Sequence, residues 1–162
     1  MSESEYFVKV AECAVAEGDR VLYTLGLGSC VAILLYDHDA KVAGMAHVLL
    51  PTPHASAADH PPAKYATTAV PHLVEEMEAA GARRDRLSAR LVGGASMFRT
   101  LVSGSLLQTG ERNLTATRRA LEDAGIPITG EEVGKEHGRS VRFFAVDGRV
   151  VVGSVLKGTV EL

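Results

Sequence analysis

Tryptophan is absent from the 162-residue sequence, aromatic residues make up only 5% of it, and there are two cysteines. So few aromatic rings offer little surface for stacking on nucleic-acid bases. Cys13 and Cys30 form no Cys-x-x-Cys pair, which argues against a thiol redox motif and against a thiolate-rich zinc site. We therefore expect two free thiols. Cys13 lies in a plain alternating segment and is expected to be a packing residue.

Positive charge and long apolar runs are also scarce. Lysine and arginine number 17 against 20 acidic residues, a net charge of −3, which gives no basic surface for nucleic acid or an anionic membrane. No window approaches the roughly 18 apolar residues of a membrane span. Residues 1–9, MSESEYFVK, lack the basic and apolar regions of a signal peptide. These features predict a cytoplasmic protein that does not insert into membranes.

The sequence does contain many short apolar segments, which alternate with turns, and two longer amphipathic ones. Its length fits a single domain over residues 1–162 with a buried core. Successive strands read as hairpins, one of them with the turn Asp147-Gly148. The pattern predicts an α+β fold in which mixed, largely antiparallel sheets pack in layers under two main helices. Strands are predicted at residues 6–14, 21–27, 31–37, 41–51 and 86–97 and as two arms within 139–156, an extended segment at 126–134, and helices at 64–81 and 110–124.

Two segments that contain proline affect the predicted secondary structure. Pro71 lies inside the first predicted helix and should kink it or mark the start of its second half. Residues 52–63 contain three prolines and two histidines. They predict a loop that is longer than most within a compact domain, and such loops often have a function.

Cys30 closes the segment TLGLGSC, directly before a run of apolar residues. If the following hairpin turns at residues 38–40, position 30 pairs with position 47 or 48, and the side chains of Cys30 and His47 can lie close together. An imidazole beside a thiol can accept its proton and so create a nucleophile. The alternative is that Cys30 is a small core residue and that His47 is a strand histidine with a backbone partner.

Glycines surround this cysteine. Gly26 and Gly28 permit backbone conformations that aim N–H groups at one point, which an oxyanion site requires. Neither this pair nor Gly93-Gly94 has the further residues of a nucleotide-binding motif, so both pairs favour tight turns. Ser29 lacks the second glycine of a serine-hydrolase elbow, and we expect it to be a turn residue or a hydrogen-bond donor.

A metal site is the other alternative. His47, His54 and His60 flank the proline-containing loop and could meet Cys30. Their spacing matches no recognised zinc pattern, and no acidic residue is placed as a partner. We therefore expect neither a metal nor an organic cofactor.

Several segments, taken in order, resemble the chemoreceptor glutamine deamidase family, CheD. The resemblance extends over about residues 6–155. Its most specific pieces are the Cys30 turn, residues 44–47 (GMAH) and residues 110–113 (GERN), and LVGGASM and IPI follow the same order.

The resemblance implies a cysteine hydrolase, a protein-glutamine glutaminase that converts glutamines of methyl-accepting chemotaxis receptors to glutamate and so regulates chemotaxis. It implies Cys30 as the nucleophile, His47 as the general base and Thr24 as the residue that orients the histidine. It also implies a layered sandwich related to toxin-type cysteine deamidases. The candidate substrate-binding residues are Gly28, Ser29, Gly94 and Ser96.

The family also binds the CheC phosphatase, which implies a CheC-type phosphatase as a regulatory partner. A second function therefore stays open, that of a binding module with little turnover that docks on this phosphatase and regulates it. The sequence departs from the family pattern at Lys135, where a second glycine is expected after Val133. The shape of the 133–140 loop therefore does not follow from the resemblance.

Overall fold

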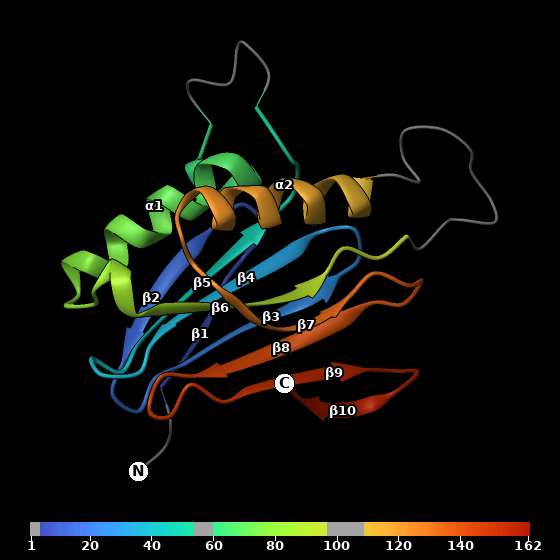
Figure 1. Ribbon diagram of the computed structural model, residues 1–162. Coiled ribbons are helices and arrows are strands. Elements are labelled where there is room, and N and C mark those ends of the chain that lie inside the picture. Colours follow the sequence, from blue (N-terminus) through green and yellow to red (C-terminus); the bar gives the residue numbers. More distant parts are fainter. Residues whose placement is uncertain (1–3, 54–59, 97–108) are drawn as a thin grey trace.

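The computed structural model describes residues 4–53, 60–96 and 109–162. Its strands form two five-stranded sheets, and two long helices cover the outer face of one sheet (Figure 1). The first sheet has the order β1-β3-β8-β9-β10 and the second the order β2-β5-β4-β6-β7. The strands are β1 (Glu5–Phe7), β2 (Cys13–Glu17), β3 (Val21–Leu27), β4 (Val31–Asp37), β5 (Val42–Val48), β6 (Leu87–Gly93), β7 (Ile128–Val133), β8 (Arg139–Phe144), β9 (Val150–Ser154) and β10 (Gly158–Glu161), and the long helices are α1 (Ala66–Ala79) and α2 (Thr109–Asp123).

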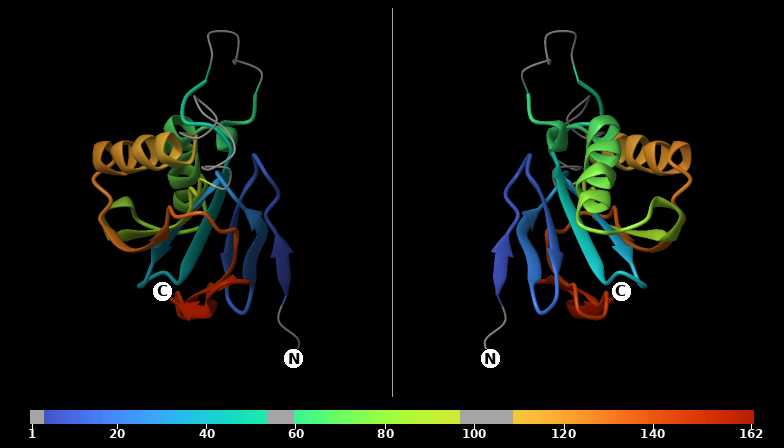
Figure 2. Two further views of the ribbon diagram at one scale, coloured as in Figure 1. Left: turned by 90° about the vertical axis from the view of Figure 1, so that its right-hand side faces the viewer. Right: turned by 90° about the vertical axis from the view of Figure 1, so that its left-hand side faces the viewer.

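The strands β4 and β5 lie between two hydrophobic cores. All their residues are buried, as expected for strands that are covered on both faces. Because side chains alternate along a strand, Val31 and Ile33 pack toward the helices, whereas Ala32 and Leu34 pack toward the first sheet. Both helices lie on the same side of the molecule in the side views of Figure 2. The layers therefore run helices, second sheet, first sheet.

Both helices bury an apolar stripe against the second sheet. In α1, the residues Val70, Leu73 and Met77 are buried, as their spacing predicts. The helix runs through Pro71 as one span and ends before Gly81, whose φ of +103° stops it. In α2, Leu114, Thr117 and Leu121 are buried, whereas Arg118 is exposed and pairs with Glu131.

The predicted α+β class, with mixed and largely antiparallel sheets, is confirmed. Two strand pairs, β1 with β3 and β6 with β7, are parallel, and the other pairs of named strands in the described residues are antiparallel. The turn at Asp147-Gly148 joins β8 to β9, and Gly148 has a φ of +77°. The final strand, β10, has no counterpart among the predicted elements.

The prediction of one strand over residues 6–14 is wrong. Residues 5–7 belong to the first sheet and residues 13–17 to the second. Between them Ala11 has a φ of +67°, a left-handed conformation that ends an extended segment. Alternation of apolar residues continued across the break and concealed it.

The predicted loop of residues 52–63 overlaps the segment 54–59, which lies outside the described residues. Its last part enters a short 3₁₀-helix, Pro62–Lys64. A second 3₁₀-helix, Arg84–Arg86, precedes β6. Among the described helices, none has both the length and the apolar character that crossing a membrane requires.

Candidate active site

A bulge in β3 allows Thr24 and Leu27 to face the same core. The pairing of β3 with β8 shifts between these two residues, and Gly26 between them has a φ of +67°. A glycine in this left-handed conformation adds one residue to a strand and redirects the side chains that follow. Thr24 and Leu27 are both 0% exposed, although regular alternation would send residues three apart to opposite faces. Thr24 precedes the bulge and pairs regularly with Val141, so it lies buried on the inner face of the first sheet, facing the second.

The turn of residues 28–30 is held through its carbonyl groups. Ala95 N–H, Asn113 Nδ2 and Gly94 N–H donate to the first, second and third carbonyl oxygens, at 2.8, 2.9 and 2.8 Å. All three donors lie on or just after β6, or on α2. The position of the Cys30 backbone is thus fixed by the segment that follows β6 and by α2.

Gly93 completes this support. Its φ is +109°, and a Cβ atom there would lie 2.3 Å from the carbonyl oxygen of Cys30. Such a contact is impossible for a side chain, so only glycine allows β6 to approach the turn this closely. The side chain of Cys30, 9% exposed, packs in the core between the two sheets.

His47 on β5 lies on the same face as Cys30. Ala32 is directly opposite His47 in the β4–β5 ladder, and Cys30 precedes Ala32 by two residues, with both packed in the core between the sheets. Diagonal neighbours of this kind are about 7–8 Å apart at the backbone, within reach of an imidazole. The predicted pairing of position 30 with 47 or 48 is wrong, because Val31 already pairs with Val48. The two side chains are diagonal neighbours instead.

Thr24 contacts His47 across the gap between the sheets. The Thr24 Oγ1 atom lies 2.8 Å from Nδ1 of His47 and 2.7 Å from the carbonyl oxygen of Val8. A carbonyl oxygen can only accept, so the single hydroxyl proton of Thr24 goes to Val8. The Thr24 oxygen then accepts from Nδ1–H of His47, and the proton of the neutral imidazole is held on Nδ1.

The other nitrogen of this ring has no partner. Nε2 of His47 is buried and forms no hydrogen bond with any described residue, Cys30 included. With the proton on Nδ1, this nitrogen is a bare acceptor. Buried acceptors without a partner are rare and costly, and they mark sites where a group is kept ready for a ligand or a proton.

Burial shifts the titration of both groups toward the neutral form. It raises the pKa of the Cys30 thiol, whereas a hydrogen bond from the backbone N–H of Cys30 itself lowers this pKa. It lowers the pKa of His47, and the carbonyl of Val8 acts in the opposite direction. The pair therefore rests as a neutral thiol and a neutral imidazole, not as a preformed ion pair.

The proposed substrate-binding residues divide into two groups. Gly28 and Ser29 lie in the turn itself. Gly94 supports the turn by donating its N–H to the carbonyl oxygen of Cys30. Ser96 N–H donates to the carbonyl oxygen of Lys135 at 2.8 Å. The structure brings the four near the Cys30 turn, but a role in substrate binding stays a prediction for each.

Lys135 adopts a φ of +60°. This left-handed conformation favours glycine and costs another residue about 1–2 kcal/mol. The 133–140 loop therefore keeps the backbone that the expected glycine would adopt, although a lysine occupies the position.

Two functional contacts were not foreseen from the sequence. Asn113, 0% exposed, donates from Nδ2 to Leu49 at 3.0 Å as well as to Ser29, and so ties the Cys30 turn to the chain that follows β5. The Val8 carbonyl sets the direction of the Thr24 hydroxyl. A polar residue within the apolar stripe of α2 was a signal for Asn113; the sequence holds no signal for a backbone carbonyl.

Cys13 differs from Cys30 in its surroundings. It is half-buried beside the core under the helices. Burial, followed by Glu76 and Glu12, raises its pKa to about 11. Within the described part of the chain, no three or more His, Cys, Asp and Glu side chains are grouped to hold a metal. His54, one of the histidines of the metal alternative, lies outside that part.

Comparison with known proteins gives a consistent family. The model of the family described as "CheD chemotactic sensory transduction" matches residues 49–154. The "Probable chemoreceptor glutamine deamidase CheD" of Caldanaerobacter subterraneus is 40% identical over 151 residues, 93% of each chain. The "Chemoreceptor glutamine deamidase CheD" of Halalkalibacterium halodurans is 38% identical over 156 residues, 96% of each chain. Among solved structures, the hypothetical protein YfiH of Bacillus licheniformis matches with a TM-score of 0.47 and 14% identity, over 81% of this chain and 59% of that one.

The family match begins at residue 49, after Thr24, Cys30 and His47. The match to the family model therefore does not depend on these three residues. Together with relatives that cover nearly the whole chain at about 40% identity, the match shows that the chain belongs to the CheD family.

Proposed function

We propose that this chain is a protein-glutamine deamidase that converts glutamines of chemoreceptors to glutamate, with Cys30 as the nucleophile. The names of its relatives support the substrate class. The observation that carries the chemistry is the hydrogen-bond chain from Val8 through Thr24 to His47. It leaves Nε2 as a bare, buried acceptor on the same face as Cys30.

The reaction begins with a proton transfer. Nε2 of His47 takes the proton of the Cys30 thiol as the sulfur forms a bond to the side-chain carbonyl carbon of glutamine. The C=O electron pair moves to the oxygen. Thr24 keeps Nδ1–H in place throughout, so that the ring holds its proton-accepting nitrogen toward the sulfur. Apo enzymes often have long contacts between such groups, which shorten in the substrate complex.

The backbone of the turn supports an oxyanion site. The peptide bonds of the turn are trans, so each N–H points opposite to the carbonyl before it. The carbonyls of Gly28 and Ser29 point at Ala95 and Asn113, which directs the N–H groups of the next residues away from that support. The N–H of Cys30 acts on its own thiol. Donors placed in this way contribute about 3 kcal/mol each to the transition state.

Collapse of the tetrahedral intermediate releases ammonia. The imidazolium of His47 gives its Nε2 proton to the leaving nitrogen, and the C–N bond breaks to leave a thioester on Cys30. Water then attacks the thioester carbon while His47 accepts its proton. The products are glutamate and the free thiol, and these steps balance without a metal or an organic cofactor.

A chemoreceptor fragment from the same genome provides the test. Intact-mass analysis detects each deamidation as a gain of about 1 Da, because a hydroxyl replaces an amine. The wild-type chain should produce the gain with one ammonia per event, and Cys30→Ala should produce none. Cys13→Ala, the matched control, should keep the wild-type rate. Deamidation of the fragment by the Cys30→Ala protein would contradict the proposal.

The cytoplasm as location and a CheC-type phosphatase as partner stay predictions from the sequence. If the chain acts mainly by docking on the phosphatase, the Cys30→Ala protein should bind and regulate that phosphatase normally, and the wild-type chain should release almost no ammonia. This outcome would favour the binding module over the enzyme.

A further inference from the structure

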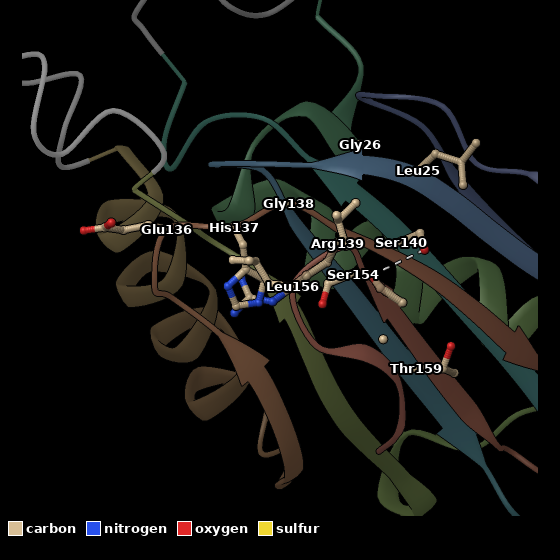
Figure 3. A pocket seen from close by; sticks show the side chains of 13 residues that line it. Leu25, Gly26, Glu136, His137, Gly138, Arg139, Ser140, Ser154, Leu156 and Thr159 are labelled. Atoms are coloured by element: carbon tan, nitrogen blue, oxygen red, sulfur yellow. Dashed lines mark hydrogen bonds between the residues drawn. The ribbon is translucent and has the colours of Figure 1, made fainter.

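A pocket on the first sheet does not have Cys30 among its lining residues. It has a volume of about 750 Å³ and lies where the end of β3 meets the loops before β8 and between β9 and β10. His137 and Arg139 extend their nitrogen atoms into the same region of this pocket (Figure 3). Glu136, which also lines it, points away from them (Figure 3).

Arg139 is the unusual residue in this pocket. Its side chain is 0% exposed, yet Nε and Nη2 have no hydrogen-bond partner among the described residues. Only Nη1 is used, in a bond of 2.8 Å to the carbonyl oxygen of Gly134. Nε2 of His137 is likewise buried without a hydrogen bond to any described residue. Buried guanidinium groups are normally paired, because an unpaired buried charge is strongly unfavourable.

The nearby charges do not balance. Among the described residues, one carboxylate, Glu132, faces the group. Its Oε1 lies 3.7 Å from Nε of Arg139, 3.9 Å from Nε2 of His137 and 3.8 Å from Nζ of Lys157. These distances exceed those of hydrogen bonds. Lys135 adds a further positive charge, and its pKa is lowered chiefly by the neighbouring ammonium of Lys157. Arg139, Lys157 and Lys135 therefore share one carboxylate, in a protein whose net charge is −3.

We propose that this pocket is an oxyanion-binding site, in which the free edge of the Arg139 guanidinium and Nε2–H of His137 bind a carboxylate or phosphate group. The fork of N–H donors on arginine matches two oxygens of such a group. Lys157 and Lys135 add positive charge beside Glu132. The site accounts for both the unpartnered donors and the excess of positive charge.

The position of the pocket connects it with the Cys30 turn. Its wall includes Gly26 in the β3 bulge. The loop beyond Glu132 is bonded to β6 and its extension, through Gly134 N–H to Gly93 and through Ser96 N–H to Lys135. An anion bound to Arg139 would therefore order the same segment that supports Cys30, whether or not the chain is a deamidase.

Titration of the whole chain with inorganic phosphate and with acetate, each replacing chloride at constant ionic strength, tests the proposal. The readout is the NMR signals of Arg139 Nε–H and of the Gly134 and Gly138 amides. Saturable shifts with phosphate alone identify a phosphate group as the ligand, and saturation by acetate identifies a carboxylate. Shifts that rise linearly with both anions, without saturation, would overturn the proposal.

Variants locate the site. Lys157→Gln, at a half-exposed position, should fold normally and weaken binding about tenfold, as for loss of one charge-assisted contact. Lys135→Asn, which tolerates the left-handed backbone, should weaken it in the same direction, and Glu132→Gln should tighten it. Arg142→Gln, on the same strand but with an exposed side chain paired to Glu5, is the control for net charge. Equal weakening by Arg142→Gln and Lys157→Gln would refute a localised site.

Discussion

Thr24 orients His47 without adding charge to it. The 2.8 Å contact joins a neutral hydroxyl to Nδ1, where many hydrolases place a carboxylate. A carboxylate would favour the imidazolium and raise the pKa of the ring. With threonine, burial outweighs the opposing effect of the Val8 carbonyl and lowers the pKa of His47. In the proposed mechanism, His47 is thereby a neutral base, and the Cys30 thiol keeps its proton until substrate arrives.

Replacement of Thr24 should separate orientation from packing. Thr24→Val removes the acceptor for Nδ1–H and should lower kcat/KM about 10- to 100-fold, since one buried hydrogen bond lost corresponds to about 1–3 kcal/mol. Thr24→Ser keeps the hydroxyl and should stay within about threefold of wild type. Steady-state kinetics on a receptor fragment, with unfolding curves for both variants, check this. Equal losses in the two variants would show that the methyl group matters and the hydroxyl does not.

The value of kcat/KM should stay at its maximum down to an unusually low pH. His47 must be neutral to accept the thiol proton, and its lowered pKa means that protonation occurs only below the ordinary value of about 6.5. The acid limb should therefore lie below pH 6.5, with full activity retained above it. An acid limb at or above the ordinary histidine value would contradict a neutral resting pair.

Alkylation should modify Cys30 before Cys13, although Cys30 is the more buried of the two cysteines. With a pKa of about 11, Cys13 is thiolate in only about one molecule in ten thousand near neutral pH. Cys30 is more buried, but His47 can accept its proton during attack on iodoacetamide. Peptide mapping should find Cys30 modified first in the wild type, and not in His47→Ala. Faster modification of Cys13 in the wild type would argue against an activated thiol.

Asn113 should act on catalysis from a distance. Asn113→Asp keeps the shape of the side chain but removes the donor that binds the carbonyls of Ser29 and Leu49. The variant should lower the free energy of unfolding by about 2 kcal/mol or more and lower kcat more than KM, because the turn loses its position. Arg119→Gln, which removes an exposed ion pair on the same helix, should leave both unchanged. If the two variants behave alike, α2 does not position the turn.

The hairpin that joins Cys30 to His47 was predictable except in its register. A turn of residues 38–40 would place His47 opposite Val31, on the helix side. The structure adds Lys41 to the turn, with a φ of +55°, and Asp37 Oδ1 accepts from the N–H groups of Asp39 and Ala40. One added residue moves every side chain of a strand to the other face. His47 thereby comes to the face of Cys30.

Other features depended on contacts between distant segments. Thr24 was selected only by family resemblance, since its hydrogen-bond partner His47 lies on the opposite sheet. The break near Ala11 left the apolar alternation intact, so no local pattern showed it. The basic residues around Arg139 come from separate loops, and a net charge of −3 gave no reason to look for them.

Trapping of the acyl intermediate tests the central claim most directly. Hydroxylamine cleaves a thioester and leaves a hydroxamate on the acyl group. If Cys30 carries the glutamyl group, wild-type chain with a receptor fragment and hydroxylamine should yield hydroxamate at the same glutamines that otherwise become glutamate, and Cys30→Ala should yield neither. Mass mapping of the fragment reads both products. Glutamate formed at these positions by the wild type with no hydroxamate under any hydroxylamine concentration would contradict a Cys30 thioester.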